Sequence, residues 1–152
     1  MSDSLPDAVL FTCNYNRVRS PMAEGLFKRF YGKRAFVDSC GLKADPAGEG
    51  VDPFVVVVMD ELGLDVSDHQ PKTFAQLEDD SFDVVVSLTP EAQHRAVELS
   101  RDRSVEIEYW PTHDPTLLDG SREARLEAYR EVRDTLAEQI KRRFGAPSTF
   151  GG

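Results

Sequence analysis

The stretch FTCNYNRVRSPMAEG, residues 11–25, joins an apolar segment to a helix through a short polar loop. The apolar segment, residues 7–13, has no turn-forming residue inside it and is typical of a buried strand. After the loop, apolar side chains recur at helical spacing from Met22 to Phe30, and Pro21 suits the first turn of a helix. A strand that leads directly into a helix is a building unit of α/β folds.

Strands and helices continue to alternate along the chain. Besides residues 7–13, strands are predicted at 34–40, 82–88 and 105–110, the last with the alternating pattern of an edge strand. Helices are predicted at 21–32, 53–63, 89–100 and 121–144. Four valines at 55–58 favour a strand, but Pro53 and Gly63 bracket a helix, and a crossover between parallel strands needs one there.

These elements predict a single α/β domain spanning residues 1–152. We expect a small, mostly parallel sheet of four strands with helices on both faces. The ends, residues 1–6 and 145–152, are expected to be flexible.

Composition limits the function. Hydrophobic residues make up 40% of the chain and charged residues 30%, which is ordinary for a water-soluble globular protein. The net charge of −9 argues against nucleic acid or an anionic membrane as a general partner. No apolar stretch approaches the ~20 residues that span a bilayer, and the acidic start MSDSLPD lacks the apolar region of a signal peptide. We therefore expect a cytoplasmic protein.

The chain has two cysteines, Cys13 and Cys40. They are too few and too far apart for a structural zinc site, and cytosolic proteins rarely contain structural disulfides. Neither a metal nor a cofactor is predicted. We expect Cys40 to be a small buried residue at a strand end, since free cysteine is among the most buried residue types.

The loop after Cys13 contains the groups that an anion site needs. Ligands of open α/β sheets bind beyond the carboxyl ends of the strands, and the first N–H groups of a helix attract anions. The same positive field, together with Arg19, favours the thiolate form of Cys13. The guanidinium of Arg19 can hold a tetrahedral oxyanion through two N–H groups. Ser20 can donate to the thiolate or cap the helix.

The loop also contains Arg17 and Tyr15. Arg17 is expected to be a solvated charge that attracts anions modestly. Tyr15 either forms a wall of the pocket or lies on the surface. The C-x5-R pattern is weak by itself, and its position between a buried strand and a helix makes it far more specific.

The loop and its surroundings resemble the low-molecular-weight protein tyrosine phosphatases and the arsenate reductases that share their fold. The resemblance covers nearly the whole chain. It rests on VLFTCNYNRVRSPMAEGLF at 9–27, VDSCG at 37–41, ELGLDVSDHQPKTF at 61–74 and HDP at 113–115. The segment WPTHDP at 110–115 and the helix after it are more similar to the arsenate reductases.

The resemblance implies a role for each matching residue. Cys13 would be the nucleophile, Asp114 the general acid, and Arg19 would bind the phosphoryl oxygens with the loop N–H groups. The implied oxyanion-binding residues are Asn14, Tyr15, Asn16, Arg17, Val18, Arg19 and Ser20. The residues implied to support the curled loop are Asn16, Ser20, Ser39 and His69.

The implied activity is hydrolysis of phosphotyrosine or other aryl phosphate monoesters through a phosphocysteine intermediate, with a phosphorylated protein or a small aryl phosphate as the substrate. The alternative is arsenate reduction, in which the same thiolate attacks arsenate and an external small thiol releases arsenite. Thioredoxin-coupled relatives carry two further cysteines after the strand that corresponds to 83–88, and this chain has none there. A non-catalytic module that only binds oxyanions is a third possibility.

The sequence also departs from the family pattern. Thr116 and Leu117 follow Asp-Pro, where the phosphatases commonly carry aromatic residues that hold the substrate ring. Val18 replaces the second loop cysteine of many relatives. Tyr15 stands where relatives often have glycine, so it either alters the loop or supplies the missing aromatic wall.

Overall fold

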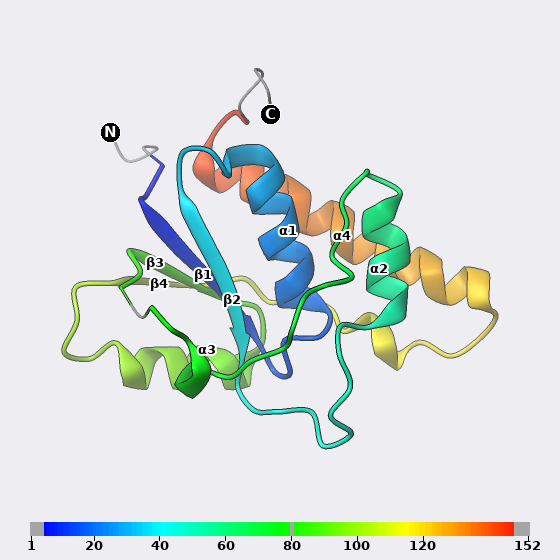
Figure 1. Cartoon of the computed structure of the whole chain (residues 1–152), viewed down its shortest axis with the longest axis horizontal. Coiled ribbons are helices and arrows are strands. Elements are labelled where there is room, and N and C mark those ends of the chain that lie inside the picture. The colour runs from blue at the N-terminus through cyan, green and yellow to red at the C-terminus, as the bar shows by residue number, and fades with distance from the viewer. Residues whose placement is uncertain (1–4, 80, 148–152) are drawn as a thin grey trace.

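A four-stranded parallel sheet forms the centre of the computed structural model, which describes residues 5–79 and 81–147 (Figure 1). Its strands are β1 (Ala8–Cys13), β2 (Phe36–Gly41), β3 (Val84–Ser87) and β4 (Glu106–Tyr109). Their order in the sheet is β2-β1-β3-β4, and each neighbouring pair is parallel. This confirms the predicted sheet, including the edge position of the last strand.

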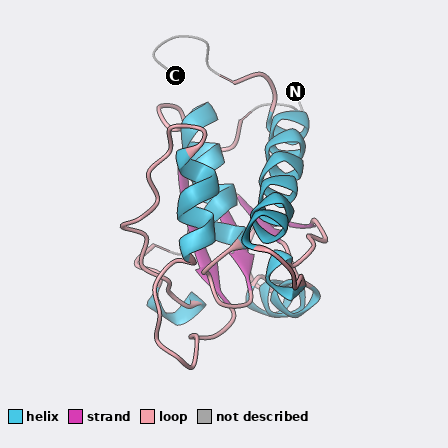
Figure 2. Cartoon of the chain, turned by 90° about the vertical axis from the view of Figure 1, so that its right-hand side faces the viewer, coloured by secondary structure: helices cyan, strands magenta, loops and turns pink. Residues whose placement is uncertain are grey.

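Helices cover both faces of the sheet, as predicted. They are α1 (Arg19–Tyr31), α2 (Pro53–Asp60), α3 (Pro90–Leu99) and α4 (Arg122–Phe144), with short 3-10 helices η1 (Phe74–Gln76) and η2 (Pro115–Leu117). The helices α1, α2 and α4 pack together on one face, with the strands behind them in Figure 2, and α3 lies on the other. No helix in the described part of the chain is long and apolar enough to cross a membrane.

The alternation of side chains along β1 divides the interior into two cores. Val9, Phe11 and Cys13 belong to the larger core beneath α1 and α4, whereas Leu10 belongs to a smaller core on the α3 side. Cys40 pairs in register with Thr12 and lies in the smaller core with Leu10. The two cysteines therefore point to opposite faces of the sheet.

The four-valine segment is helical, as the bracketing residues predicted. Asp52 caps α2 by accepting a hydrogen bond from the N–H of Phe54 at 2.8 Å, and Pro53 occupies the first turn. Val55 and Val58 are fully buried. Packing of this apolar stripe against the α1–α4 layer overrides the strand preference of valine. The helix ends at Asp60, before the predicted boundary.

The start of α1 also differs from the prediction. The helix begins at Arg19, two residues before Pro21, so Arg19 and Ser20 are already helical. No side-chain cap satisfies the N-terminus of α1 among the described residues. Its first N–H groups are therefore left for the loop and for an anion.

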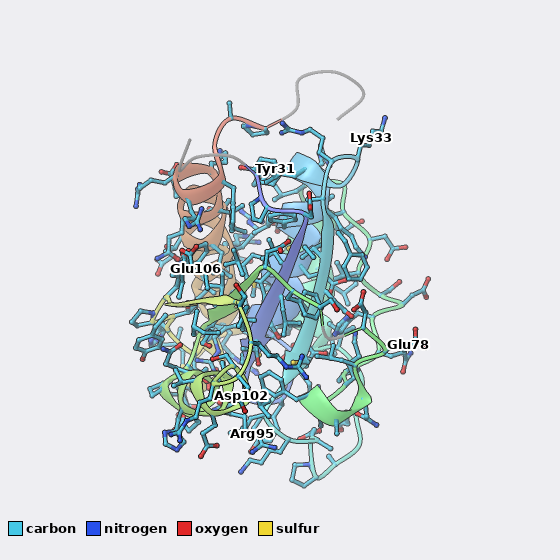
Figure 3. The ribbon with its side chains drawn as sticks, turned by 90° about the vertical axis from the view of Figure 1, so that its left-hand side faces the viewer. Tyr31, Lys33, Glu78, Arg95, Asp102 and Glu106 are labelled. Atoms are coloured by element: carbon cyan, nitrogen blue, oxygen red, sulfur yellow. The ribbon has the colours of Figure 1, made fainter. Side chains whose placement is uncertain are left out.

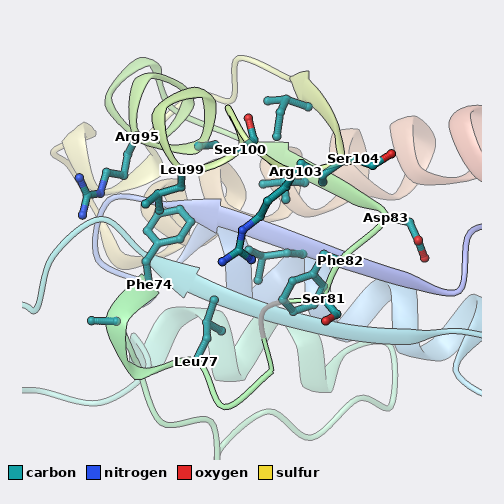
Figure 4. Close-up of a pocket in the computed structure, with 16 residues that line it drawn as sticks. Phe74, Leu77, Ser81, Phe82, Asp83, Arg95, Leu99, Ser100, Arg103 and Ser104 are labelled. Atoms are coloured by element: carbon teal, nitrogen blue, oxygen red, sulfur yellow. The ribbon is translucent and has the colours of Figure 1, made fainter.

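The α3 face of the sheet is covered less completely (Figure 3). A cavity of about 660 Å³ lies between α3 and η1, with Phe74, Leu77 and Leu99 among its walls (Figure 4). Leu10 of β1 and Val85 of β3 also line it. The cavity lies on the opposite face of the sheet from the side chain of Cys13.

Of the ends expected to be flexible, residues 1–4 and 148–152 lie outside the described residues. Near them, Leu5 packs against the larger core. The hydroxyl of Tyr31 donates to the carbonyl of Gly145 at 2.5 Å.

Candidate active site

The polar loop runs from Cys13, the last residue of β1, to Arg19, the first residue of α1. Asn16 is the one residue other than glycine with a positive φ, 59°, in the described chain. Asparagine tolerates this left-handed conformation better than most residues. Tyr15 does not adopt it, so the tyrosine is accommodated in the loop without this backbone strain. Tyr15 is partly exposed, and the ammonium of Lys43 lies 5.8 Å from its ring centre.

The side chain of Asn16 is fully buried and holds the loop in place. Its Nδ2 donates to the Oγ of Ser20 at 2.8 Å and to the Oγ of Ser39 at 2.9 Å. Its Oδ1 accepts from the N–H of Lys72 at 3.0 Å and lies 3.0 Å from the Nε2 of His69. All four hydrogen-bonding positions of the amide are used, which fixes its orientation.

The orientation of the Asn16 amide determines how Ser20 can hydrogen-bond to the thiol of Cys13. The Oγ of Ser20 lies 2.9 Å from the Sγ of Cys13. Because this oxygen already accepts from Asn16, its own hydrogen is available to donate to an ionised Cys13. Cys13 is 2% exposed and forms the floor of the loop.

His69 lies behind the loop, where the resemblance placed it. Its Nε2 faces two acceptors, the Oδ1 of Asn16 at 3.0 Å and the carbonyl oxygen of Asn16 at 3.2 Å, so we assign its proton to Nε2. Its Nδ1 is 3.9 Å from a carboxylate oxygen of Glu24. Burial lowers the pKa of His69, and the Glu24 carboxylate only partly opposes this effect.

The lowered pKa of His69 predicts a pH-dependent stability. As the pH falls below the usual histidine pKa of about 6.5, the unfolded chain takes up a proton before the folded protein does. We expect the free energy of unfolding, measured by urea denaturation, to fall more steeply from about pH 7.5 to about pH 5.5 in the wild type than in His69→Gln. His94→Gln, at an exposed histidine of α3, is the control and should keep the wild-type slope. Equal slopes in all three proteins would contradict a neutral, buried His69.

Glu24 extends the network and was missed by the sequence analysis. The Oγ of Ser39 donates to its carboxylate at 2.5 Å, and the ammonium of Lys28 lies 3.1 Å from the other oxygen. The available signal was helical spacing, since Glu24 follows Ser20 by one turn and faces the same side of α1.

Gly41 and Thr89 also support the loop and were not predicted to do so. A Cβ added at Gly41 would lie 2.7 Å from the carbonyl carbon of Tyr15 and 2.8 Å from the nitrogen of Asn16. The loop thus requires a glycine at the end of β2. The hydroxyl of Thr89, which caps α3, also donates to the Oδ1 of Asn14 at 2.7 Å. The pairing of β2 with β1 brings Gly41 beside Cys13, and this pairing is not visible in the local sequence.

Arg19 and Asp114 come together across the open side of the loop. The Nη1 of Arg19 donates to the carbonyl of Thr112 at 3.0 Å, and its Nη2 is 3.8 Å from the Oδ2 of Asp114. The Oδ1 of Asp114 accepts from both the N–H and the hydroxyl of Thr116, at 3.0 and 2.7 Å. Thr116 therefore holds the carboxylate with Oδ2 toward Arg19.

The interpretation of Arg17 as a solvated charge was wrong. Its Nε donates to the carbonyl of Gly50 at 2.6 Å, and its Nη2 is 3.4 Å from Glu49. Its carbonyl accepts from the N–H of Asp52 at 3.1 Å. The side chain of Arg17 thus ties the segment before α2 to the loop after Cys13 instead of pointing into solvent.

Neither position 18 of the loop, which is a valine, nor Cys40 provides a second thiol at this site. Val18 is buried in the larger core. Cys40 is fully buried on the opposite face of the sheet, with its Sγ 3.7 Å from the hydroxyl of Thr12. Burial raises the pKa of Cys40 to about 12. Across residues 5–79 and 81–147, no cluster of three or more histidine, cysteine or acidic side chains is placed to hold a metal ion.

Known proteins are similar to this chain over most of its length. The family described as low molecular weight phosphotyrosine protein phosphatase matches residues 8–146. An arsenate reductase of Halalkalibacterium halodurans is 32% identical over 133 residues, which cover 88% of this chain and 91% of the relative. A glutaredoxin arsenate reductase of Synechocystis is also 32% identical, and the aligned region covers 88% of this chain and 92% of the relative.

A solved structure shows the same fold. The low molecular weight protein tyrosine phosphatase from T. tengcongensis superposes with a TM-score of 0.73 at 27% identity and covers 89% of this chain and 95% of its own. The family match spans the strand, loop and helix that carry Cys13 and Arg19 as well as the Asp114 loop. The chain belongs to the low molecular weight phosphotyrosine protein phosphatase family.

Proposed function

We propose that this enzyme hydrolyses phosphotyrosine or other aryl phosphate monoesters through a phosphocysteine intermediate. One observation carries the proposal: Asp114 faces Arg19 at the mouth of the loop that holds Cys13, while the other thiol of the chain is buried on the opposite face of the sheet. The chain can therefore supply a nucleophile and an acid at one place, but no second thiol of its own.

In the first step, the Cys13 thiolate attacks phosphorus as the bond to the phenol oxygen breaks. Asp114 gives its proton to the leaving oxygen, because a phenolate with a pKa of about 10 leaves slowly without one. Arg19 and the N–H groups of residues 14–19 stabilise the charge on the three remaining oxygens. The products of this step are a phenol and a phosphocysteine.

In the second step, water attacks the phosphocysteine and Asp114 takes its proton. The sulfur–phosphorus bond breaks, and inorganic phosphate and the Cys13 thiolate are released. The hydroxyl of Ser20, 2.9 Å from the sulfur, can stabilise this thiolate as it leaves. The same contact keeps Cys13 ready for the next attack.

Arsenate reduction is the second candidate, and the arsenate reductases at 32% identity favour it. Cys13 would attack arsenate to form a sulfur–arsenic bond, while one arsenic–oxygen bond breaks and that oxygen leaves as water. An external thiol would then attack the Cys13 sulfur, and the two electrons of the broken bond would reduce arsenic(V) to arsenic(III). The burial of Cys40 means that a thiol of another molecule, such as glutathione or a glutaredoxin, would have to make this attack.

A paired assay tests the proposal against this candidate. The purified enzyme is given phenyl phosphate without thiols and, separately, arsenate with glutathione and a glutaredoxin. We expect phosphate release from phenyl phosphate and no arsenite above the level of the Cys13→Ser variant. Arsenite formation without phosphate release would replace hydrolysis by reduction as the function of this site.

Gly41→Ala tests the loop geometry. The added Cβ would overlap the backbone of Tyr15 and Asn16, so the loop has to move. We expect kcat/KM for phenyl phosphate to fall about 100-fold, since displacements of about 1 Å cost that much in well-oriented sites. In Gly50→Ala, nothing lies within 4 Å of the added Cβ, and this matched control should keep the wild-type rate. Full activity of Gly41→Ala would show that the loop does not depend on this contact.

A further inference from the structure

A cavity of about 510 Å³ adjoins the catalytic loop on the side of α2 and α4. Arg17 of the loop, Phe54 of α2, and Arg122, Arg125 and Tyr129 of α4 all contribute to its wall. Figure 1 shows the N-terminal half of α4 beside α2. Because Arg17 belongs both to this wall and to the loop after Cys13, a substrate bound at the loop can reach into the cavity with its neighbouring groups.

Two arginines of this cavity are held on an aromatic ring. The guanidinium carbons of Arg122 and Arg125 lie 5.2 and 4.7 Å from the ring centre of Phe54. Such stacking uses the flat face of a guanidinium and leaves its N–H groups available to bind a carboxylate or phosphate. Within the described parts of the chain, neither Arg122 nor Arg125 forms an ion pair, although Arg130 farther along α4 pairs with three glutamates.

The ring that holds these arginines is itself fixed. Phe54 packs edge-on against Tyr129 at 5.2 Å between ring centres. The hydroxyl of Tyr129 donates to the Oδ2 of Asp52 at 2.8 Å, and the Oδ1 of Asp52 accepts from the N–H of Phe54. The orientation of the Phe54 ring is therefore already fixed before an anion binds to the two arginines. Binding then costs little additional side-chain entropy.

The acidic groups of the cavity, Asp52 and Glu49, contact groups other than the two arginines. Both carboxylate oxygens of Asp52 accept hydrogen bonds from Tyr129 and the α2 backbone. Glu49 lies 3.4 Å from Arg17. The charges of Arg122 and Arg125 thus remain available to a ligand.

We propose that Arg122 and Arg125 form a subsite for acidic side chains that flank the phosphotyrosine of a peptide substrate. The inference rests on the proposed phosphatase function and narrows its substrate class. The net charge of −9 disfavours the approach of an acidic peptide in general, so its binding requires a local positive surface beside the loop. Asp or Glu next to the phosphotyrosine would be recognised there through guanidinium–carboxylate pairs.

Calorimetric binding of two phosphotyrosine peptides tests the subsite. One peptide carries aspartates beside the phosphotyrosine and the other carries asparagines, and both are titrated into Cys13→Ser protein, which cannot turn them over. We expect the acidic peptide to bind about 5-fold tighter, which is the gain in affinity expected from two exposed ion pairs. This difference in affinity should shrink as the salt concentration is raised. Adding Arg122→Gln and Arg125→Gln should reduce the ratio to about 1.

The matched control adds Arg95→Gln and Arg142→Gln, which remove the same charge at exposed positions elsewhere. It should retain the preference. Equal affinities of the two peptides for Cys13→Ser protein, or an equal loss in the control, would overturn the subsite. Hydrolysis of phenyl phosphate by the wild type separates the two proposals: turnover with equal peptide affinities overturns the subsite alone, and a preference without turnover overturns the hydrolytic function alone.

Discussion

Cys13→Ser is expected to lower kcat for phenyl phosphate by about 10⁴-fold or more. A serine hydroxyl at this position is not ionised near neutral pH, and it is a much weaker nucleophile toward phosphorus than a thiolate. The loop itself should persist, because Asn16 and not the thiol fixes its curl through Ser20, Ser39 and Lys72. The variant should therefore still bind inorganic phosphate, as calorimetry can measure.

Cys40→Ala is the control for this experiment. Cys40 lies in the smaller core on the opposite face of the sheet, so its removal should leave kcat unchanged even if stability falls. Turnover that survives Cys13→Ser would contradict the nucleophilic role of Cys13. A large loss of kcat in folded Cys40→Ala would contradict the conclusion that one thiol performs the reaction.

Asp114→Asn is expected to have the second largest effect. Loss of a general acid typically costs 10²–10⁴-fold, and the effect should depend on the leaving group. For phenyl phosphate, whose phenol has a pKa of about 10, we expect kcat to fall about 10³-fold. For an aryl phosphate with a strongly acidic phenol, the first step needs no proton, so the fall should be much smaller.

Asn is a close match in shape, and its Oδ1 can still accept the two hydrogen bonds from Thr116. The loop that carries Asp114 should therefore keep its position, and the substitution should remove only the proton that the carboxyl group donates. Asp119→Asn, an exposed residue of the same loop, is the control and should behave as the wild type. Equal losses for both leaving groups would contradict an acid role for Asp114 and would favour an electrostatic effect on Arg19.

The fold was largely predictable because its signals are local. Buried strands, helix caps and the need for crossover helices predicted the order of the elements, and even the four-valine segment was resolved by Pro53 and Gly63. The boundaries were less accurate, since α1 begins at Arg19 and α2 ends at Asp60. Hydrogen bonding within the loop, which sets where α1 starts, is not encoded in periodicity.

The residues of the site likewise divide into those that the local sequence predicts and those whose contacts depend on tertiary packing. Cys13 and Arg19 follow from their spacing between a strand and a helix, whereas Asp114 could be assigned only by family resemblance. Glu24 and Gly41 were missed because their contacts with the loop depend on how α1 and β2 pack against it. The expectation for Arg17 failed for a related reason, since its partner is a backbone carbonyl 33 residues away along the chain.

A covalent phosphoryl group on Cys13 is the most direct test of the account. Asp114→Asn protein is mixed with an aryl phosphate that has a strongly acidic phenol, so that the first step is fast and the second, which needs a base, is slow. The reaction is quenched with acid and the peptide containing Cys13 is analysed by mass spectrometry. We predict one phosphoryl group on this peptide, formed at the rate of phenol release and absent from Cys13→Ser. Phenol release with no phosphoryl group on Cys13 at any time would contradict the mechanism.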